Sequence, residues 1–266
     1  MHLTHISTPT LSIKEQHLPP TQRKMKLLIG ALCIAAFVNH AVASADPPFS
    51  SISTDNSTVR QIIIDTHNAY RRNASPSARN MLKMVWNEDA ANNAASWSAG
   101  CTGSHSPPDK RTIPGFSCGE NLFLASYPAS WEEAVKAWFD ENESFEYGVG
   151  PKSPDQVVGH YTQVMWYNSY MVGCSVSYCP KSQYKYFYVC QYCPAGNIEG
   201  VMNTPYKAGP KCADCVEACD NSLCTNYCPY QDTYSSCSNY TSYCNTFPAI
   251  RDGCKATCLC TNNQIV

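Results

Sequence analysis

The sequence predicts a mixed α/β domain followed by a small module that disulfides hold together. Segments with helical periodicity alternate with two short runs of aromatic and β-branched residues, which is typical of a layered α/β domain. Cysteines are sparse from residue 101 to 193 and crowded from 212 to 260, where ten of them occur. So short a segment buries too little apolar surface to be stable alone, and it therefore needs covalent cross-links.

The N-terminal segment has the three parts of a secretory signal. Residues 27–38 form an apolar run, basic residues at 23, 24 and 26 precede it, and Ala43-Ser44-Ala45 follows at the cleavage position. A membrane span needs roughly 20 apolar residues, so the run is too short for one, and a buried core helix would not need the basic flank. We expect residues 1–45 to be a leader, with the signal peptide at 25–45. We also expect translation to start at Met25, which leaves residues 1–24 untranslated.

An exported chain of this composition should carry eight disulfides. Sixteen cysteines follow residue 45, and the seventeenth, Cys33, is lost with the leader. An even count in an oxidising compartment indicates disulfides, although Cys190-x-x-Cys193 and Cys212-x-x-Cys215 also have the spacing of half a zinc ribbon. Spacing alone leaves the pairing open. We expect a secreted, extracellular monomer without a membrane span.

The charge balance argues against a nucleic-acid partner. Removal of the leader leaves 15 basic groups against 20 acidic ones, and the basic residues form no stripe. Four sequons suit a glycoprotein of the secretory pathway, with asparagines at Asn56, Asn73, Asn142 and Asn239. Asn142 adjoins a candidate site residue, Glu141, and we expect its side chain to point outward, because adjacent helical residues diverge by about 100°.

Four helices are predicted in the first domain. Residues 58–72 place Val59, Ile62, Ile63, His67, Ala69 and Tyr70 on one face, where His67 is expected to be a packed, hydrogen-bonded histidine. A second helix is expected at residues 88–101, with Asn87 as its N-cap. Ser130-x-x-Glu133 is a capping box that opens a third helix with Trp131, Val135, Trp138 and Phe139 inward, and residues 157–166 suit a fourth.

Two strands and two irregular stretches complete the pattern. Residues 171–178 and 185–192 are rich in strand-forming residues, and a hairpin-length link joins them. Residues 102–128 contain prolines and glycines without a clear period, so we expect irregular chain there. Residues 198–211 have the composition of a linker and lead into the cysteine-rich segment.

Two histidines and two glutamates form a candidate metal site. Cys101-Thr102-Gly103-Ser104-His105-Ser106 and Cys118-Gly119-Glu120-Asn121 place His105 and Glu120 close to cysteines. Glu141 ends the third helix, and His160 lies in the segment just before the first strand. Two imidazoles with carboxylates suit a borderline metal, and zinc is the expected ion. The alternative is that both histidines only hold loops together.

Three segments resemble known signatures. Gly159-His160-Tyr161-Thr162-Gln163-Val164-Met165-Trp166-Tyr167-Asn168-Ser169 and Phe187-Tyr188-Val189-Cys190-Gln191-Tyr192-Cys193-Pro194-Ala195-Gly196-Asn197-Ile198 are similar to the two signatures of the CAP superfamily. His67-Asn68-Ala69-Tyr70-Arg71-Arg72 resembles its opening helix. The number, order and spacing of the cysteines then resemble the cysteine-rich secretory proteins (CRISP) within that superfamily, over residues 58–266.

The resemblance implies an architecture and a pairing of cysteines. It implies a three-layer α-β-α sandwich (the CAP domain) at 46–197, a linker and hinge at 198–227, and a toxin-like cysteine-rich module at 228–266. It places the family's cavity tetrad on His105, Glu120, Glu141 and His160, with both histidines as zinc ligands. The implied disulfides are Cys101–Cys179, Cys118–Cys193, Cys174–Cys190, Cys212–Cys219, Cys215–Cys224, Cys228–Cys260, Cys237–Cys254 and Cys244–Cys258.

The resemblance also orders the hypotheses of function. The first is a secreted, non-enzymatic regulator that binds an ion channel or cell-surface receptor through its cysteine-rich module, in reproduction, defence or a venom-like setting. Six aromatic residues near the C-terminus are equally consistent with a protein-binding face and with rings that pack against the disulfides: Tyr227, Tyr230, Tyr234, Tyr240, Tyr243 and Phe247. The alternatives are a zinc-dependent peptidase that uses the tetrad, and a sterol or lipid carrier with Trp131 and Trp138 facing inward. Fold and parts alone do not establish catalysis.

Overall fold

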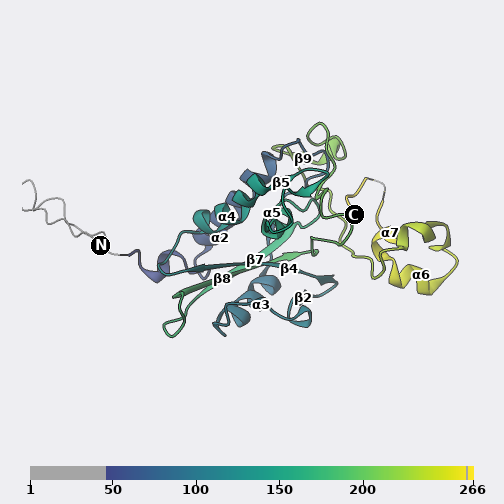
Figure 1. Ribbon diagram of the computed structural model, residues 1–266. Coiled ribbons are helices and arrows are strands. Elements are labelled where there is room, and N and C mark those ends of the chain that lie inside the picture. The colour runs from purple at the N-terminus through teal and green to yellow at the C-terminus, as the bar shows by residue number, and fades with distance from the viewer. Residues whose placement is uncertain (1–45, 262) are drawn as a thin grey trace, which may run out of the picture. The chain divides into compact units, whose positions relative to one another are not determined.

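The computed structural model describes residues 46–261 and 263–266 (Figure 1). The predicted leader, its signal peptide and Cys33 lie outside the described residues. Within the described part of the chain, no helix combines the length and the apolar character that crossing a membrane requires.

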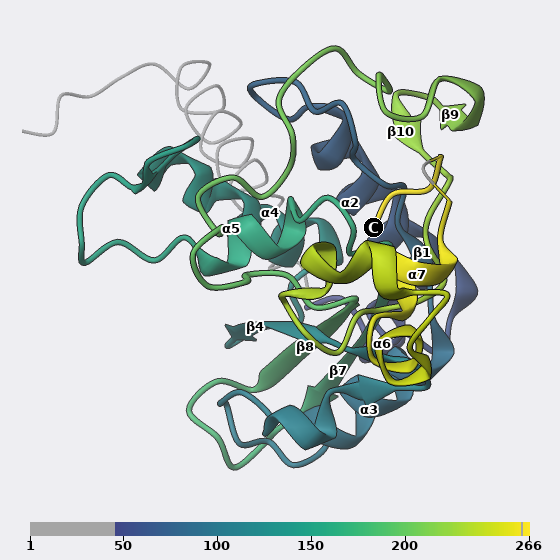
Figure 2. The ribbon, with the colours of Figure 1, turned by 90° about the vertical axis from the view of Figure 1, so that its right-hand side faces the viewer.

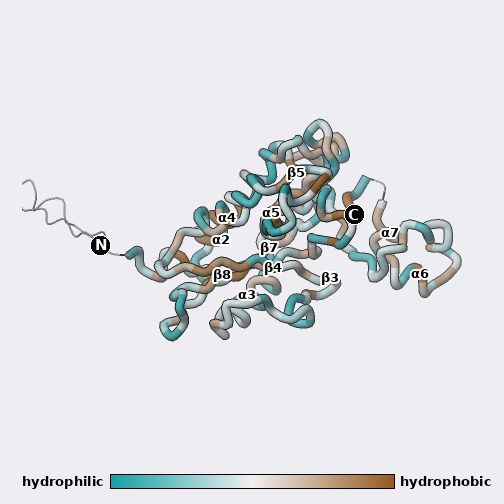
Figure 3. The backbone as a smooth tube through the Cα atoms, viewed as in Figure 1, coloured by the Kyte–Doolittle hydropathy of each residue, from teal (hydrophilic) through white to brown (hydrophobic). Residues whose placement is uncertain are grey.

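A four-stranded sheet forms the centre of the first domain. Its strands are β1 (Val85–Trp86), β7 (Met171–Tyr178), β8 (Tyr186–Cys193) and β4 (Gly119–Ala125), in the order β1-β7-β8-β4. β1 runs parallel to β7, and the other pairs are antiparallel. Nearly every residue of β7 and β8 is buried, because both faces of the sheet are covered. Figure 3 shows the hydrophobic colour along β8.

Helices cover both faces of this sheet. Three helices lie on one face, α2 (Ser57–Arg72), α4 (Trp131–Asp140) and α5 (Gly159–Val164), and α3 (Glu88–Ser98) lies on the other (Figures 1 and 2). The predicted α-β-α sandwich is therefore confirmed. α3 lies so close to β7 that a Cβ on Gly173 would stand 2.1 Å from the backbone nitrogen of Ala91.

α2 forms where the periodicity places it, but its buried face is partly polar. Asn56 caps the helix by accepting a hydrogen bond from the amide of Thr58. Val59, Ile63 and His67 are buried as predicted, whereas Ala69 is exposed, which the apolar pattern missed. Asn68 and Arg71 are buried instead, because their side chains bond backbone carbonyls of neighbouring segments.

α3 and α4 begin at the predicted caps. Asn87 accepts from the amide of Ala90, and Ser130 accepts from the amide of Glu133. The Glu133 carboxylate accepts from the Tyr127 hydroxyl, so the reciprocal half of the capping box is replaced by another contact. Inward-facing Trp131, Val135 and Trp138 of α4 are buried, and half-buried Phe139 stacks on Tyr70 with ring centroids 4.1 Å apart.

The prediction of irregular chain over residues 102–128 is wrong. The segment contains β4 and the small hairpin of β2 (Thr112–Ile113) and β3 (Phe116–Ser117). β4 reads Gly-Glu-Asn-Leu-Phe-Leu-Ala, without polar alternation, because the domain covers both of its faces. Its two polar residues, Glu120 and Asn121, are buried through hydrogen bonds, so hydrophobicity does not reveal them as strand residues.

Other element ends also differ from the prediction. The helix expected at 88–101 ends at Ser98, and the one expected at 157–166 is limited to α5. β1 was not predicted, because its two residues are too few to show a period. A further hairpin, β5 (Phe145–Glu146) with β6 (Gly150–Pro151), follows the 3-10 turn Glu141–Ser144.

The stretch predicted as a linker packs on the first domain. Tyr206 is only 2% exposed, and the carbonyl of Pro205 accepts a hydrogen bond from the amide of Tyr167. The Asn80 side chain accepts from the amide of Lys207. Residues 198–211 therefore form part of the packed body rather than a free connection.

Short elements and disulfides build the rest of the chain. The hinge contains the hairpin of β9 (Cys219–Asp220) and β10 (Leu223–Cys224), and the module contains η5 (Cys237–Tyr243), α6 (Pro248–Gly253) and α7 (Lys255–Leu259). Eight disulfides occur, and they are the same pairs that the resemblance implies: Cys101–Cys179, Cys118–Cys193, Cys174–Cys190, Cys212–Cys219, Cys215–Cys224, Cys228–Cys260, Cys237–Cys254 and Cys244–Cys258.

Candidate functional site

The four predicted site residues form two histidine–glutamate pairs. His105 Nδ1 lies 2.9 Å from Glu120 Oε1, and His160 Nδ1 lies 2.6 Å from Glu141 Oε1. An ionised carboxylate only accepts hydrogen bonds, so in each pair Nδ1 carries the proton. The Nε2 atom of each imidazole then keeps its lone pair available.

Glu120 is a buried carboxylate that several donors stabilise. Its Oε1 also accepts from the amide of Ser106 at 2.9 Å, and its Oε2 accepts from the Ser106 hydroxyl at 2.6 Å and from Gln191 Nε2 at 3.3 Å. Burial by itself raises the pKa of Glu120, but the hydrogen bonds from His105, Ser106 and Gln191 together outweigh it and lower the pKa. The group is thus held as an anion that orients His105.

Glu141 orients His160 and also caps a helix. Its Oε2 accepts from the backbone amides of His160 at 2.9 Å and Tyr161 at 3.1 Å, which are in the first turn of α5. The residue before that helix is Val158, which has no side-chain oxygen to satisfy these amides. The carboxylate therefore fills the capping role from the end of α4, and it places a negative charge at the positive end of the α5 dipole.

Each imidazole is paired with a carboxylate in the way that is usual for a metal-binding histidine. The His105 side chain is 51% exposed and that of His160 is 28% exposed, so neither imidazole is sealed off from solvent. Carboxylates that fix the Nδ1 proton are the usual partners of metal-binding histidines. Both glutamates already accept several hydrogen bonds, which leaves two ligands from the protein, whereas catalytic zinc sites have three plus a general base.

The packed histidine that the sequence predicts is His67. It is fully buried, its Nδ1 donates to the carbonyl of Ile63 at 2.7 Å, and its Nε2 accepts from the Tyr192 hydroxyl at 2.9 Å. Burial lowers its pKa to about 4, opposed by the bond to Ile63 and assisted by the charge of Arg71. His67 is therefore a neutral structural residue.

Sequence reasoning missed several residues that support the site. Ser106 and Gln191 bond Glu120, and Asn121 Nδ2 donates to the carbonyl of His160 at 3.1 Å. All three lie inside segments that the sequence singles out, but a buried polar residue gives no signal until its partner is known. Arg71, in the opening-helix motif, bonds carbonyls of Leu82, Val164, Trp166 and Tyr167.

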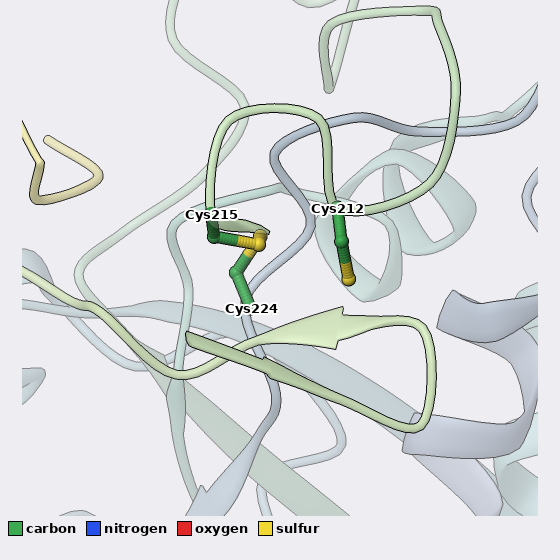
Figure 4. Close-up of side chains that lie close together, drawn as sticks. All are labelled: Cys212, Cys215 and Cys224. Atoms are coloured by element: carbon green, nitrogen blue, oxygen red, sulfur yellow. A yellow bond between two sulfur atoms is a disulfide. The ribbon is translucent and has the colours of Figure 1, made fainter. Parts of the chain in front are cut away.

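Three hinge sulfurs lie together, but they do not offer a metal site. The Sγ atoms of Cys212, Cys215 and Cys224 lie within 4.8 Å of one another (Figure 4). Cys212 is bonded to Cys219, and Cys215 is bonded to Cys224, so each of the three sulfurs already belongs to a disulfide. Metals bind the thiolate form of cysteine, and a disulfide has none.

The cysteine-rich module presents an aromatic row, which consists of Tyr240, Tyr243 and Phe247. In a 3-10 helix residues three apart eclipse, so Tyr240 and Tyr243 of η5 lie on one side, with ring centroids 6.4 Å apart. Phe247 follows at 5.6 Å from Tyr243. The three residues are 42%, 46% and 51% exposed, so each keeps a large part of its surface open to solvent.

The sequon asparagines lie in different settings. Asn73 and Asn239 are exposed, and Asn56 is the cap of α2. Asn142 is half-buried and lines a cavity of about 280 Å³ together with Asn73, Phe139 and Tyr161. No tetrad residue lines that cavity, but the half-buried setting of Asn142 differs from the outward orientation that the sequence predicts.

Known protein families match both parts of the chain. The family described as the cysteine-rich secretory protein family (CAP) matches residues 64–192, and the one described as Crisp matches residues 212–265. The chain is 49% identical to human "Cysteine-rich secretory protein 3" over 220 residues, which covers 82% of this chain and 89% of the human protein.

Solved structures share the fold. "Crystal structure of NaASP2 with Zn2+" is 31% identical with a TM-score of 0.54, and the match covers 64% of this chain and 96% of that one. Na-ASP-1 is 30% identical with a TM-score of 0.54, and the match covers 63% of this chain and 47% of Na-ASP-1. BmVAL-1, 22% identical with a TM-score of 0.53, shows the same fold.

Proposed function

The chain belongs to the cysteine-rich secretory protein family, and from that premise we propose that it is a secreted protein that binds and regulates a membrane protein of another cell. The binding face is the aromatic row of the cysteine-rich module, and the partner is an ion channel or cell-surface receptor. Secretion is supported by the leader-like sequence before residue 46 and by the eight disulfides, which persist in oxidising compartments.

The observation that carries this proposal is the exposure of three neighbouring aromatic rings on a cross-linked scaffold. Tyrosine and phenylalanine offer large contact areas with few rotatable bonds, so binding through them loses little conformational entropy. The bridge Cys237–Cys254 joins the first residue of η5 to the residue after α6, and Cys244–Cys258 joins the residue after η5 to α7. The two bridges therefore cross-link the elements that carry the aromatic row to their neighbours. A rigid support of this kind reduces the entropy that a binding surface loses when it meets its partner.

Basic side chains accompany the row on the following helices. Arg251 of α6 and Lys255 of α7 are exposed, and neither forms an ion pair among the described residues. Cations in the same module as the aromatic row suit a partner surface with acidic groups, such as the extracellular rim of a cation channel. They would raise the association rate and make it depend on salt.

The test is electrophysiology with the full secreted protein on calcium, potassium and ryanodine-type channels. The variant Tyr240→Ala/Tyr243→Ala/Phe247→Ala should lose the effect on current, with a loss of affinity of at least about tenfold, since each aromatic anchor typically contributes more than about 1 kcal/mol. The matched control removes exposed tyrosines of the first domain, Tyr178→Ala/Tyr184→Ala, and should act like the wild type. Silence of the wild-type protein on every channel of the panel would contradict the channel proposal.

We also propose that His105 and His160 hold a divalent metal such as zinc through their Nε2 atoms. The support is the donor geometry above, together with the 31% identity to NaASP2, whose structure is described with Zn2+. Such a site would be structural or regulatory, because Glu120 and Glu141 are engaged as partners of the histidines. The geometry therefore favours a binding protein over a peptidase.

Lipid carriage is the less favoured alternative. Trp131 and Trp138, which suggested an apolar pocket, are core residues that are 2% exposed. Their indole nitrogens donate to the carbonyls of Ile52 and Leu122, each at 2.8 Å. Core packing accounts for both residues without a ligand.

A further inference from the structure

We propose that the hinge is a disulfide-exchange site, at which a small-molecule thiol converts the bridges Cys212–Cys219 and Cys215–Cys224 into Cys212–Cys215 and Cys219–Cys224. The proposal rests on the arrangement of these four cysteines within residues 212–224, and it is independent of the metal and of the aromatic row. The conversion changes how the hinge is held without any net oxidation or reduction.

The first requirement is that a sulfur of one bridge lies near both sulfurs of the other. The Sγ atoms of Cys212, Cys215 and Cys224 are mutually within 4.8 Å, and Figure 4 shows the Cys212 side chain beside the Cys215–Cys224 bridge. Disulfides exchange by direct attack of a thiolate on a neighbouring disulfide sulfur. A thiolate released at Cys212 would therefore be formed next to its target.

The second requirement is that the new bridges fit the backbone as it stands. The amide of Cys215 donates to the carbonyl of Cys212 at 3.0 Å, so the two cysteines occupy the corners of a tight turn, whose Cα atoms lie within about 7 Å. Cys219 and Cys224 are directly opposite each other in the β9–β10 hairpin. The corners of a tight turn and opposite residues of an antiparallel pair are typically separated by distances close to those that a disulfide spans, about 4.4–6.8 Å between Cα atoms.

The chain already contains a disulfide between two opposite residues of antiparallel strands. Cys174 and Cys190 are opposite residues of the antiparallel strands β7 and β8, and they form a disulfide. A Cys219–Cys224 bridge would repeat that arrangement in a shorter hairpin, whose two-residue turn Asn221-Ser222 has positive φ at both positions, as tight hairpin turns require.

The third requirement is an entry point for the incoming thiol. Cys219 is exposed, whereas Cys212, Cys215 and Cys224 are buried. An external thiolate can reach Cys219 Sγ, and the buried partner Cys212 then becomes the leaving group. Buried bridges elsewhere are protected from the same attack because exchange depends on access to the sulfur.

The exchange then balances in three steps. The external thiol loses its proton to solvent, its sulfur bonds Cys219 Sγ, and the Cys212–Cys219 bond breaks to release the Cys212 thiolate. The Cys212 thiolate bonds Cys215 Sγ, and the Cys215–Cys224 bond breaks to release the Cys224 thiolate. The Cys224 thiolate bonds Cys219 Sγ opposite it and expels the external thiolate, which regains its proton.

The product differs from the starting state in what it ties together. The present bridges join the turn at 212–215 to the hairpin at 219–224. The exchanged bridges close the turn and the hairpin separately, so no covalent bond links them apart from the backbone. The segment that leads into the cysteine-rich module would thereby become looser, since fewer covalent cross-links restrict it.

The test is disulfide mapping of the folded protein after exposure to reduced glutathione at neutral pH without denaturant. Acid quenching and alkylation trap the products. Cleavage after Lys211 and Glu217 and before Asp214 and Asp220 places each of the four cysteines on its own peptide. We expect glutathione on Cys219 first, followed by Cys212–Cys215 and Cys219–Cys224 bridges, at least about tenfold faster than any change at Cys101–Cys179 or in the module.

Three outcomes decide the proposal. Retention of Cys212–Cys219 and Cys215–Cys224 while other bridges take up glutathione would overturn it, and so would a mixed disulfide at Cys219 that never yields Cys212–Cys215. The variant Cys212→Ala/Cys219→Ala keeps Cys215–Cys224 and should no longer incorporate glutathione at the hinge. Incorporation there at the wild-type rate would also overturn the proposal, and if the variant is not secreted, the mapping of the wild-type protein decides alone.

Discussion

Glu120 and Asn121 are consecutive residues of β4 that hold the two histidine segments from opposite faces of the sheet. Glu120 accepts hydrogen bonds from His105 and Ser106, and Asn121 donates to the carbonyl of His160. Successive strand residues point to opposite faces, so an edge strand can fix one segment on each side. β4 is an edge strand of the sheet, so it can hold the His105 segment on one face and the His160 segment on the other.

A chain of hydrogen bonds extends from Asn121 into the core. Its Nδ2 also lies 3.5 Å from the Tyr192 hydroxyl, which donates to His67 Nε2 at 2.9 Å. The backbone of His160 is thereby connected to a buried, neutral histidine on α2. The position of the candidate metal ligand therefore depends on the core rather than on a surface loop.

Loss of the Glu141 carboxylate should weaken metal binding. Glu141→Gln leaves the size of the side chain but removes the charge that fixes the Nδ1 proton of His160, and such partners are typically worth about 10–100-fold in metal affinity. Calorimetric titration of zinc into the metal-free protein measures the effect. Glu143→Gln, two residues away and exposed, is the matched control, and an equal loss in both variants would contradict the assignment.

Replacement of Arg71 should cost more stability than any surface substitution. The residue is 1% exposed, its guanidinium donates to four carbonyl groups, and burial lowers its pKa to about 9. Arg71→Met would leave several carbonyls unpaired, each at about 1–3 kcal/mol, and we expect a total loss of at least about 3 kcal/mol. Urea unfolding measures it. Arg72→Met, whose half-buried side chain bonds the carbonyl of Asn221, should lose less than about 1 kcal/mol.

The fold should lose stability between pH 6.5 and pH 4 because of His67. Its folded pKa is lowered to about 4, below the unfolded value near 6.5, so the unfolded chain binds the proton first. The contribution is complete above pH 6.5 and disappears as the pH falls through that interval, with a size of about 3 kcal/mol. Urea midpoints at pH 7.5 and pH 4.5 test this. His67→Gln should be less stable at pH 7.5 and show a smaller drop at low pH, and an unchanged drop would refute the attribution.

The sequence predicted the disulfides and the helices better than it predicted the β-sheet. Helices such as α2 and α4 have apolar periods and polar caps, and the cysteine pattern resembled a family whose pairing the structure repeats. β4 was missed because Glu120 and Asn121 make its first part polar, and their burial depends on partners far away in the sequence. Ser106 and Gln191 were missed for the same reason, because hydrophobic periodicity indicates which face of a helix or strand is buried but not which residues form hydrogen bonds.

The family resemblance predicted the four residues of the tetrad as a set, but their individual roles emerged only from the geometry. Glu141 looked like a second carboxylate for a metal, and the structure gives it the amides of His160 and Tyr161 as well. The sequence contains no sign of this, because Val158 lacks a capping side chain and the substitute comes from another helix.

The measurement that tests the central claim most directly is site-specific photo-crosslinking of the full secreted protein to living target cells. A photoreactive phenylalanine at position 243, in the aromatic row, should yield a cross-link to one membrane protein, and the same group at position 184, on the first domain, should not. Cross-linking from position 184 alone, or equally from both positions, would contradict the assignment of the cysteine-rich module as the binding face.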